Sequence, residues 1–323
     1  MVAELIVEKS VYNKPILLVI FNRPENTKKV FEAIRNEKPR RLFVAADGPR
    51  NTHPDDQTKC LAARRAATAV DWECDVKTFF NDVNIGCGRG PANAINWFFE
   101  HVDEGIILED DCLASHDFFV FCEELLDRYR NDDRVMQIGG TNLNKVEIVP
   151  DPYSYFFSNH NMTWGWATWK RAWKFYDFEM RLYKTMRDSS PFHTCFASND
   201  ELEYFRTIFD RTVANLDDLS WWDYQWEFSR RINSGLTIVP KKNLVVNLGI
   251  GSDATHTTDP HGAGSDLKFE PMTFPLVHPE FVLADKIRDE VFFKHTLTTG
   301  LSRTKARIKK VVPRFLLDLR GHN

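Results

Sequence analysis

Three adjacent acidic residues, Glu109, Asp110 and Asp111, are the part of the sequence most suited to chemistry. They follow the apolar run 106–108, which is typical of the end of a buried strand in a sheet covered on both faces. Three neighbouring carboxylates repel one another, so they need either contact with water or a cation. Hard cations such as Mg²⁺ and Mn²⁺ prefer oxygen ligands and bridge to diphosphates. A polar turn before a helix starting at Ser115 fits the local pattern equally well, because acids are common at helix starts.

The elements around these acids alternate in type along the first half of the chain. Continuous apolar runs predict strands and amphipathic runs predict helices. The expected strands are 15–21, 41–46, 75–80 and the run that ends at the three acids, and the expected helices are 25–36, 55–70 and 92–102. Such alternation predicts βαβ units and a mostly parallel sheet, in which ligands bind at the carboxyl ends of the strands. Those ends carry Asn22 and Arg23, Asp47, and the three acids.

A glycine-rich segment, Gly86-Cys87-Gly88-Arg89-Gly90, is expected to be a loop between the third strand and the following helix. Its spacing fits neither the dinucleotide fingerprint nor the Walker A motif. Backbone N–H groups and Arg89 could contact a phosphate there. A flexible connector explains the segment equally well.

The second half is rich in aromatic residues and loses the alternation after Asn142. Expected elements are helices at 115–131, 201–215 and 221–233, a helix through Trp173 after the Trp164–Trp169 stretch, strands at 135–140 and 153–157, and a strand pair at 236–240 and 244–247. Residues 250–265 show no periodicity and form a loop of a length that is usually functional or disordered.

Two further residues in this half could take part in chemistry. Asp223 lies among the aromatics of 221–226, where loss of solvation would suit a general base. It also precedes an apolar-periodic run, and the local pattern favours a helix N-cap. His256, in the long loop, could contact a metal or a phosphate, although a solvated surface histidine is the commoner outcome.

Composition limits the class of protein. The chain has 323 residues, 43% of them hydrophobic and 27% charged, which is ordinary for a globular protein. Its net charge of -4 argues against nucleic-acid binding through bulk electrostatics. The six cysteines form no Cys-x-x-Cys pair, and residues 1–14 contain no long apolar stretch, so we expect a cytoplasmic protein without a signal peptide or membrane anchor.

The C-terminal residues 303–320 combine apolar side chains at helical spacing with seven basic residues and the single acid Asp318. A basic amphipathic helix fits attachment to an anionic bilayer surface. A helix packed on the domain with a solvated basic face fits equally well, and Pro313 predicts a kink.

Taken together, several blocks of the sequence resemble GT-A-type glycosyltransferases, in particular the family-2-like bacterial transferases. These are similar in turn to the inverting N-acetylglucosaminyltransferase that initiates complex N-glycans. The resemblance covers roughly residues 15 to 260 in blocks: Asn22-Arg23, Asp47-Gly48, Glu109-Asp110-Asp111 as a variant of the DxD motif followed by Phe118-Phe119, Trp164-Gly165-Trp166, Trp222-Asp223-Tyr224-Gln225-Trp226, and 252–257.

The resemblance implies a GT-A fold, an α/β architecture whose mostly parallel sheet carries helices on both faces, with a smaller aromatic-rich acceptor-side subdomain. It also implies roles: Asp111 would bind Mn²⁺ or Mg²⁺, Asp223 would be the general base, and the loop 250–264 would fold over the donor. The remaining candidates for nucleotide-sugar binding are Asn22 and Arg23 on the nucleotide, Asp47 on the uracil, Asp110 on the ribose or donor sugar, Glu109 in support, and Arg89 and His256.

The sequence therefore predicts three portions: a nucleotide-sugar-binding core at 13–147, an acceptor-side and lid portion at 148–290, and a basic tail at 291–323. The predicted function is metal-dependent inverting transfer from a UDP-sugar to a glycan or lipid-linked acceptor, on the cytoplasmic side and peripheral to the membrane. The alternatives are a sugar-nucleotide nucleotidylyltransferase, which usually carries a glycine-rich basic signature after its first strand, and a non-catalytic carbohydrate-binding or membrane-associated module.

Overall fold

The computed structural model describes residues 12–143, 150–249 and 264–298. Its central element is an eight-stranded sheet with the strand order β3-β2-β1-β4-β8-β6-β9-β7, beside a two-stranded sheet of β10 and β5. The strands are β1 Ile16–Ile20, β2 Arg41–Ala46, β3 Asp75–Phe80, β4 Glu104–Glu109, β5 Cys112–Ala114, β6 Val135–Gly139, β7 Tyr155–Ser158, β8 Trp166–Trp169, β9 Leu236–Pro240 and β10 Val245–Asn247.

The sheet is mixed, with its parallel part on the N-terminal side. β1, β2, β3 and β4 pair in parallel. β8 lies antiparallel between β4 and β6, β9 runs parallel to β6, and β7 closes the edge antiparallel to β9. The predicted α/β class with a mostly parallel sheet is confirmed for β1 to β4.

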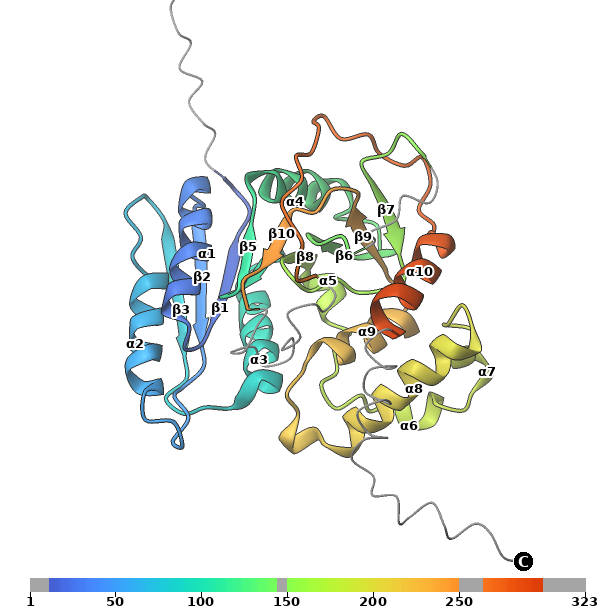
Figure 1. Cartoon of the computed structure of the whole chain (residues 1–323), viewed down its shortest axis with the longest axis horizontal. Coiled ribbons are helices and arrows are strands. Elements are labelled where there is room, and N and C mark those ends of the chain that lie inside the picture. Colours follow the sequence, from blue (N-terminus) through green and yellow to red (C-terminus); the bar gives the residue numbers. More distant parts are fainter. Residues whose placement is uncertain (1–11, 144–149, 250–263, 299–323) are drawn as a thin grey trace, which may run out of the picture.

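Helices cover both faces of the sheet (Figure 1). One face packs against α1 Pro24–Glu37, α2 Asp56–Ala67 and α4 His116–Arg128. The other packs against α3 Gly86–His101, α5 Lys170–Trp173 and α9 Asp223–Ile232. Successive residues of β1 point to opposite faces, so Leu18 joins the first core and Leu17 the second.

A smaller aromatic core lies beside the sheet, as the sequence predicts. It is built by α6 Tyr183–Met186, α7 Ser190–His193, α8 Asn199–Ala214 and one side of α9, and it contains Tyr183, Phe192, Phe196, Phe205, Phe209 and Phe228. A short 3-10 turn at Leu216–Asp218 leads toward α9, and α10 Lys286–Phe292 continues as the π-helical turn Phe293–Leu297. Strands from both the 13–147 and the 148–290 portions share the large sheet.

Two local predictions were wrong, and one strand was missed. Residues 86–90 form the first turns of α3 rather than a loop. Trp166–Trp169 forms the central strand β8, which the sequence pattern did not reveal. The segments 236–240 and 244–247 do not pair with each other, because β9 joins β6 and β7 whereas β10 joins β5. In each case the local structure depends on a contact with a residue or strand that is distant in sequence.

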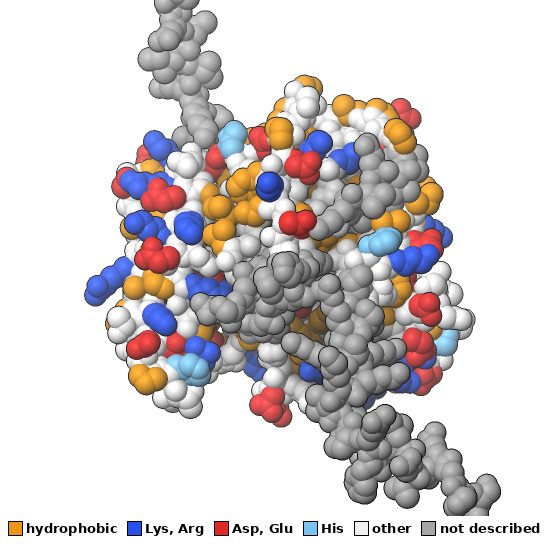
Figure 2. Space-filling view, viewed as in Figure 1, with side chains coloured by type: hydrophobic (Ala, Val, Ile, Leu, Met, Phe, Trp, Pro, Cys, Tyr) orange, Lys and Arg blue, Asp and Glu red, His pale blue; other side chains and the backbone are white. Residues whose placement is uncertain are grey.

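Charged side chains of both signs are interspersed on the described part of the face shown in Figure 2. No helix within 12–143, 150–249 and 264–298 is long and apolar enough to cross a bilayer. The predicted basic helix in 303–320 and the loop residue His256 lie outside the described residues.

Candidate active site

A pocket of about 570 Å³ opens at the carboxyl ends of β1, β2 and β4. Among the described residues that line it, the acids are Asp47, Glu109, Asp110, Asp111 and Asp223, and the cations are Arg23 and Arg50. Its aromatic wall consists of Phe21, Phe79, Trp164, Trp221, Trp222 and Tyr224. The structure therefore brings the three acids together with Arg23, Asp47 and Asp223.

The acidic turn is held by Arg23 and by backbone N–H groups of the residues that directly follow β1 and β10. The Asp110 carboxylate is buried, and accepts hydrogen bonds from the Phe21 N–H at 3.0 Å and from Arg23 Nη1 at 3.3 Å. Arg23 Nη1 also lies 2.8 Å from Asp111 Oδ2. The Leu248 N–H donates to the Asp111 carbonyl at 2.7 Å, which joins the turn to the segment after β10. The Asp110 carboxylate, which was predicted to contact the ribose or donor sugar, is thus already hydrogen-bonded to groups of the protein.

The single positive charge of Arg23 does not balance the three carboxylates of this turn. Burial, followed by the Asp111 carboxylate, raises the pKa values of both Glu109 and Asp110. Asp223 is close enough to contribute to the effect on Glu109, while a hydrogen bond with Trp222 opposes it. Clustered carboxylates with raised pKa values are typical of functional sites, because the repulsion of buried like charges is relieved by protonation or by a bound cation.

The oxygen donors at Asp111 fit a hard divalent cation. A Cβ atom on Gly249 would lie only 2.3 Å from Asp111 Oδ2, so glycine keeps the space beside this carboxylate open. Within the described part of the chain, no three side chains are already gathered as a metal-binding group. A cation at Asp111 would therefore take most of its ligands from the substrate and water, which is how Mg²⁺ commonly binds in proteins.

Asp223 is the first residue of α9 and lines the same pocket. Trp222 occupies the N-cap position, so the interpretation of Asp223 as the cap is wrong. The Asp223 carbonyl accepts a hydrogen bond from Asn161 Nδ2 at 3.1 Å. The neighbouring Tyr176 and Tyr224 hydroxyls have raised pKa values, caused first by burial, with the Asp223 charge adding to the shift.

Asp47 organises the wall formed by residues 81–86. Its carboxylate accepts hydrogen bonds from the backbone N–H groups of Gly48, Ile85 and Gly86 and from the amides of Asn81 and Asn84, over 2.9 to 3.2 Å. Two of these donors begin α3, which explains why the glycine segment is helical. The predicted contact between Asp47 and uracil remains a prediction, and the carboxylate is already saturated with protein donors.

Two other predicted residues face away from the main pocket. The Asn22 amide donates to Asp56 Oδ1 at 2.7 Å, on the α2 side. Arg89 lies over the Phe178 ring at 4.5 Å and lines a separate cavity of about 300 Å³ between α3 and residues 176–181. Cys87 and Gly90 of α3 line the main pocket, whereas Arg89 lies on another face of the same helix.

Arg50 is a site residue that the sequence analysis missed. Its guanidinium Nε and Nη2 donate to the buried carboxylate of Asp56 at 2.6 and 3.1 Å, and its carbon Cζ lies 5.3 Å from the centre of the Phe21 ring. This pairing holds the pKa of Asp56 far below its usual range. Arg50 directly follows the Asp47-Gly48-Pro49 turn at the end of β2, and that position was a usable indication.

Comparisons with known proteins leave the family open. No family model and no curated protein matches the sequence. Several solved structures resemble part of the chain, including the three that follow. HddC from Yersinia pseudotuberculosis has a TM-score of 0.30 and 9% identity over 49% of this chain and 77% of its own. The inositol-1-phosphate CTP transferase from T. maritima has a TM-score of 0.29 and 11% identity over 50% and 73%.

The third structure, 4-diphosphocytidyl-2C-methyl-D-erythritolsynthase from Anaerococcus prevotii, has a TM-score of 0.29 and 12% identity over 61% of this chain and 84% of its own. These similarities are distant. The α/β class of the chain therefore follows from the strand order and registers of its own sheet.

Proposed function

We propose that the chain is a metal-dependent inverting glycosyltransferase. It would move a sugar from a UDP-sugar, such as UDP-GlcNAc, to a hydroxyl group of a glycan or lipid-linked acceptor. The observation that supports this proposal is the convergence of Glu109, Asp110, Asp111 and Asp223 in one aromatic-lined pocket at the carboxyl ends of parallel strands. Such a pocket would offer oxygen ligands to a cation and, separately, an acid that could accept a proton.

The donor would lie across the ends of β1, β2 and β4. Asp111 would hold Mn²⁺ or Mg²⁺, which when bound offsets the charge of the leaving diphosphate. Arg23 and Arg50 are the cations among the described lining residues, and they would face the phosphates and the nucleoside. Phe21, beneath Arg50, offers an apolar ring beside the nucleoside position.

Asp223 would act as the general base. Its carboxylate would remove the proton of the acceptor hydroxyl while that oxygen attacks the anomeric carbon of the donor. The bond between this carbon and the diphosphate breaks, and its electron pair leaves with the diphosphate. A single displacement of this kind inverts the configuration at the anomeric carbon. Trp221, Trp222 and Tyr224 around Asp223 give the acceptor sugar apolar faces to pack against.

A sugar-nucleotide nucleotidylyltransferase is the second candidate, because two of the distant structural matches are described as a CTP transferase and a diphosphocytidyl synthase. The lining of the pocket favours the first candidate. A triphosphate carries more negative charge than a diphosphate, and both Arg23 and Arg50 are already paired with carboxylates of the protein. The two reactions release different products, namely a nucleoside diphosphate and pyrophosphate.

The proposal is tested by thermal-shift screening of nucleotide sugars and nucleoside triphosphates with and without Mn²⁺, followed by assays for released UDP and pyrophosphate. Ligands that bind the folded state raise its melting temperature. We expect a Mn²⁺-dependent shift with a UDP-sugar and release of UDP once an acceptor is present. Pyrophosphate release from a triphosphate and a sugar phosphate would instead establish the second candidate. Glycan binding without turnover of any nucleotide would indicate a non-catalytic module.

Two variants assign the roles. Asp111→Asn should abolish the Mn²⁺-dependent part of UDP binding in calorimetry, because the cation loses its charged ligand. Asp223→Asn should keep UDP binding and lower the transfer rate by about a hundredfold or more, as expected for loss of a general base. Asp133→Asn, at a solvent-exposed acid, is the matched control. Unchanged UDP affinity in Asp111→Asn would remove the metal role, and full transfer by Asp223→Asn would remove the base.

A further inference from the structure

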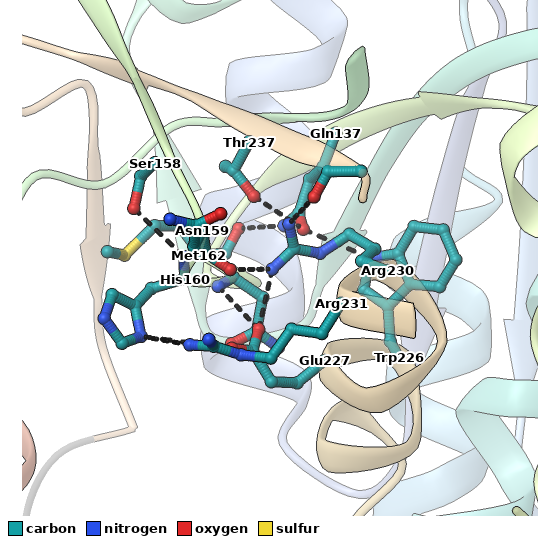
Figure 3. A network of polar contacts seen from close by, with 12 residues as sticks. Gln137, Ser158, Asn159, His160, Met162, Trp226, Glu227, Arg230, Arg231 and Thr237 are labelled. Atoms are coloured by element: carbon teal, nitrogen blue, oxygen red, sulfur yellow. Dashed lines mark hydrogen bonds and ion pairs between the residues drawn. The ribbon is translucent and has the colours of Figure 1, made fainter. Parts of the chain in front are cut away.

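Side chains of α9, the helix that begins with Asp223, form a buried network of charged groups with α8 and with the segment after β7 (Figure 3). Glu227 and Arg230 are both 0% exposed, and Glu227 Oε2 accepts from Arg230 Nη2 at 2.6 Å. Glu227 Oε1 accepts from Arg231 Nε at 2.6 Å, and Arg231 also reaches Glu201 on α8 at 2.8 Å. Each carboxylate therefore has an arginine partner, which buried charges require.

The network ties α9 to the sheet and to the segment after β7. Arg230 donates to the Gly235 carbonyl before β9 and to the Asn159 carbonyl, both at 3.0 Å. Trp226 Nε1 donates to Gln137 of β6 at 3.1 Å. Removal of one partner from a buried pair is strongly destabilising, so the stability of the fold depends on α9 keeping these contacts.

Asn161 connects this network to the acid in the pocket. Its backbone N–H donates to Glu227 Oε2 at 2.9 Å, and its side-chain Nδ2 donates to the Asp223 carbonyl at 3.1 Å. The two contacts lie one helical turn apart on α9. Asn161 therefore links the first turn of the helix, from which the Asp223 side chain extends, to the second turn, where Glu227 is fully buried.

We propose that Asn161 is a positioning residue for Asp223. The inference rests on the proposed function in one respect, namely that Asp223 accepts a proton from the acceptor. The amide of Asn161 holds the first turn of α9, and so keeps the Asp223 carboxylate within reach of the attacking oxygen. Without this amide the turn gains freedom to rotate, and small displacements of a reacting group lower the rate steeply.

Asn159 provides a matched control two positions earlier. Its side chain also belongs to the network, but it donates to Asp289 of α10 at 2.9 Å rather than to Asp223. Asn159→Ala and Asn161→Ala therefore remove the same amide from the same segment. Only the second change removes a contact with the first turn of α9.

The first measurement does not depend on activity. Hydrogen exchange followed by mass spectrometry is compared for peptides covering 222–229 in the wild type and both variants. We expect exchange in this region to be about tenfold faster in Asn161→Ala and unchanged in Asn159→Ala, because local opening follows the loss of local contacts. Equal exchange in all three proteins would overturn the positioning role, whether or not the proposed function holds.

The second measurement separates positioning from a general loss of structure. We expect kcat for transfer to fall by about tenfold or more in Asn161→Ala, with the donor Kd near the wild-type value. Asn161→Asp keeps the size of the side chain but donates a hydrogen bond only when protonated, so its kcat relative to the wild type should recover as the pH is lowered. Equal losses in Asn159→Ala and Asn161→Ala, or a pH-independent loss in Asn161→Asp, would contradict the proposal.

Discussion

His160 makes the stability of the buried charged network of α9 dependent on pH. The ring is 2% exposed and has a pKa lowered to about 3, first by burial and then by the Arg231 cation (Figure 3). The Glu201 and Glu227 carboxylates lie 3.6 and 3.9 Å from its ring nitrogens, but both are already paired with Arg231. His160 is therefore buried as the neutral imidazole.

The sign of the effect follows from comparing the folded and unfolded chains. An unfolded histidine titrates near 6.5, so between this value and about 3 the unfolded chain binds one more proton than the folded chain. The free energy of unfolding is therefore highest above pH 6.5 and falls as the pH is lowered. The full difference amounts to about 5 kcal/mol, at about 1.4 kcal/mol for each tenfold change in the dissociation constant, and about 2 kcal/mol of it is lost by about pH 5.

Equilibrium urea unfolding at about pH 7.5 and about pH 5 measures this loss in the wild type and in His160→Gln. Asp289 acts in the opposite direction, because burial raises its pKa to about 6 and its protonation stabilises the folded state. It is present in both proteins, so its effect cancels in the difference between them. We expect the wild type to lose about 2 kcal/mol more on acidification than the variant. An equal loss in both proteins would refute a neutral, buried His160.

Two further changes test the walls of the pocket. Asp47→Asn replaces a carboxylate that accepts from Gly48, Ile85 and Gly86 with a group that has one acceptor oxygen. It should lower the free energy of unfolding by about 2 to 3 kcal/mol, measured by urea unfolding, and wild-type stability would contradict the capping role. Arg50→Gln should weaken UDP binding in calorimetry by about tenfold. Arg65→Gln, at an exposed position on α2, serves as its control. Equal affinity of the two variants for UDP would exclude Arg50 from donor binding.

The order and type of the early elements were predictable from sequence because each depends on local composition. β1, β2 and β4 contain continuous apolar runs, as strands buried on both faces do, whereas the edge strand β3 is only partly buried; the helix between β1 and β2 repeats its apolar residues at helical spacing. The same reasoning failed at 86–90, where glycines indicated a loop. There the Asp47 carboxylate, distant in sequence, supplies the acceptor that allows the N–H groups at the start of α3 to be buried.

In the candidate site, too, local sequence predicted some residues and contacts distant in sequence decided others. Arg23, Asp47 and Glu109–Asp111 were expected together, because parallel strands deliver their carboxyl ends to one edge. Arg89 was expected there too, but the helical periodicity of α3 turns it toward another cavity. Arg50 was missed, because its place is set by the buried Asp56 on a different helix.

The sequence alone determined which acids are present and that an alternating sheet would deliver three of them to a strand end. The charge and the exact position of these acids were decided only by the tertiary structure. The charge of Glu109 and Asp110 depends on burial, on Arg23 and on Asp223, and the position of Asp223 depends on Asn161 and Glu227. Electrostatic and hydrogen-bonding energies depend on distance in space and on solvent exclusion. Both quantities are set by which segments pack together, and a local sequence pattern contains neither.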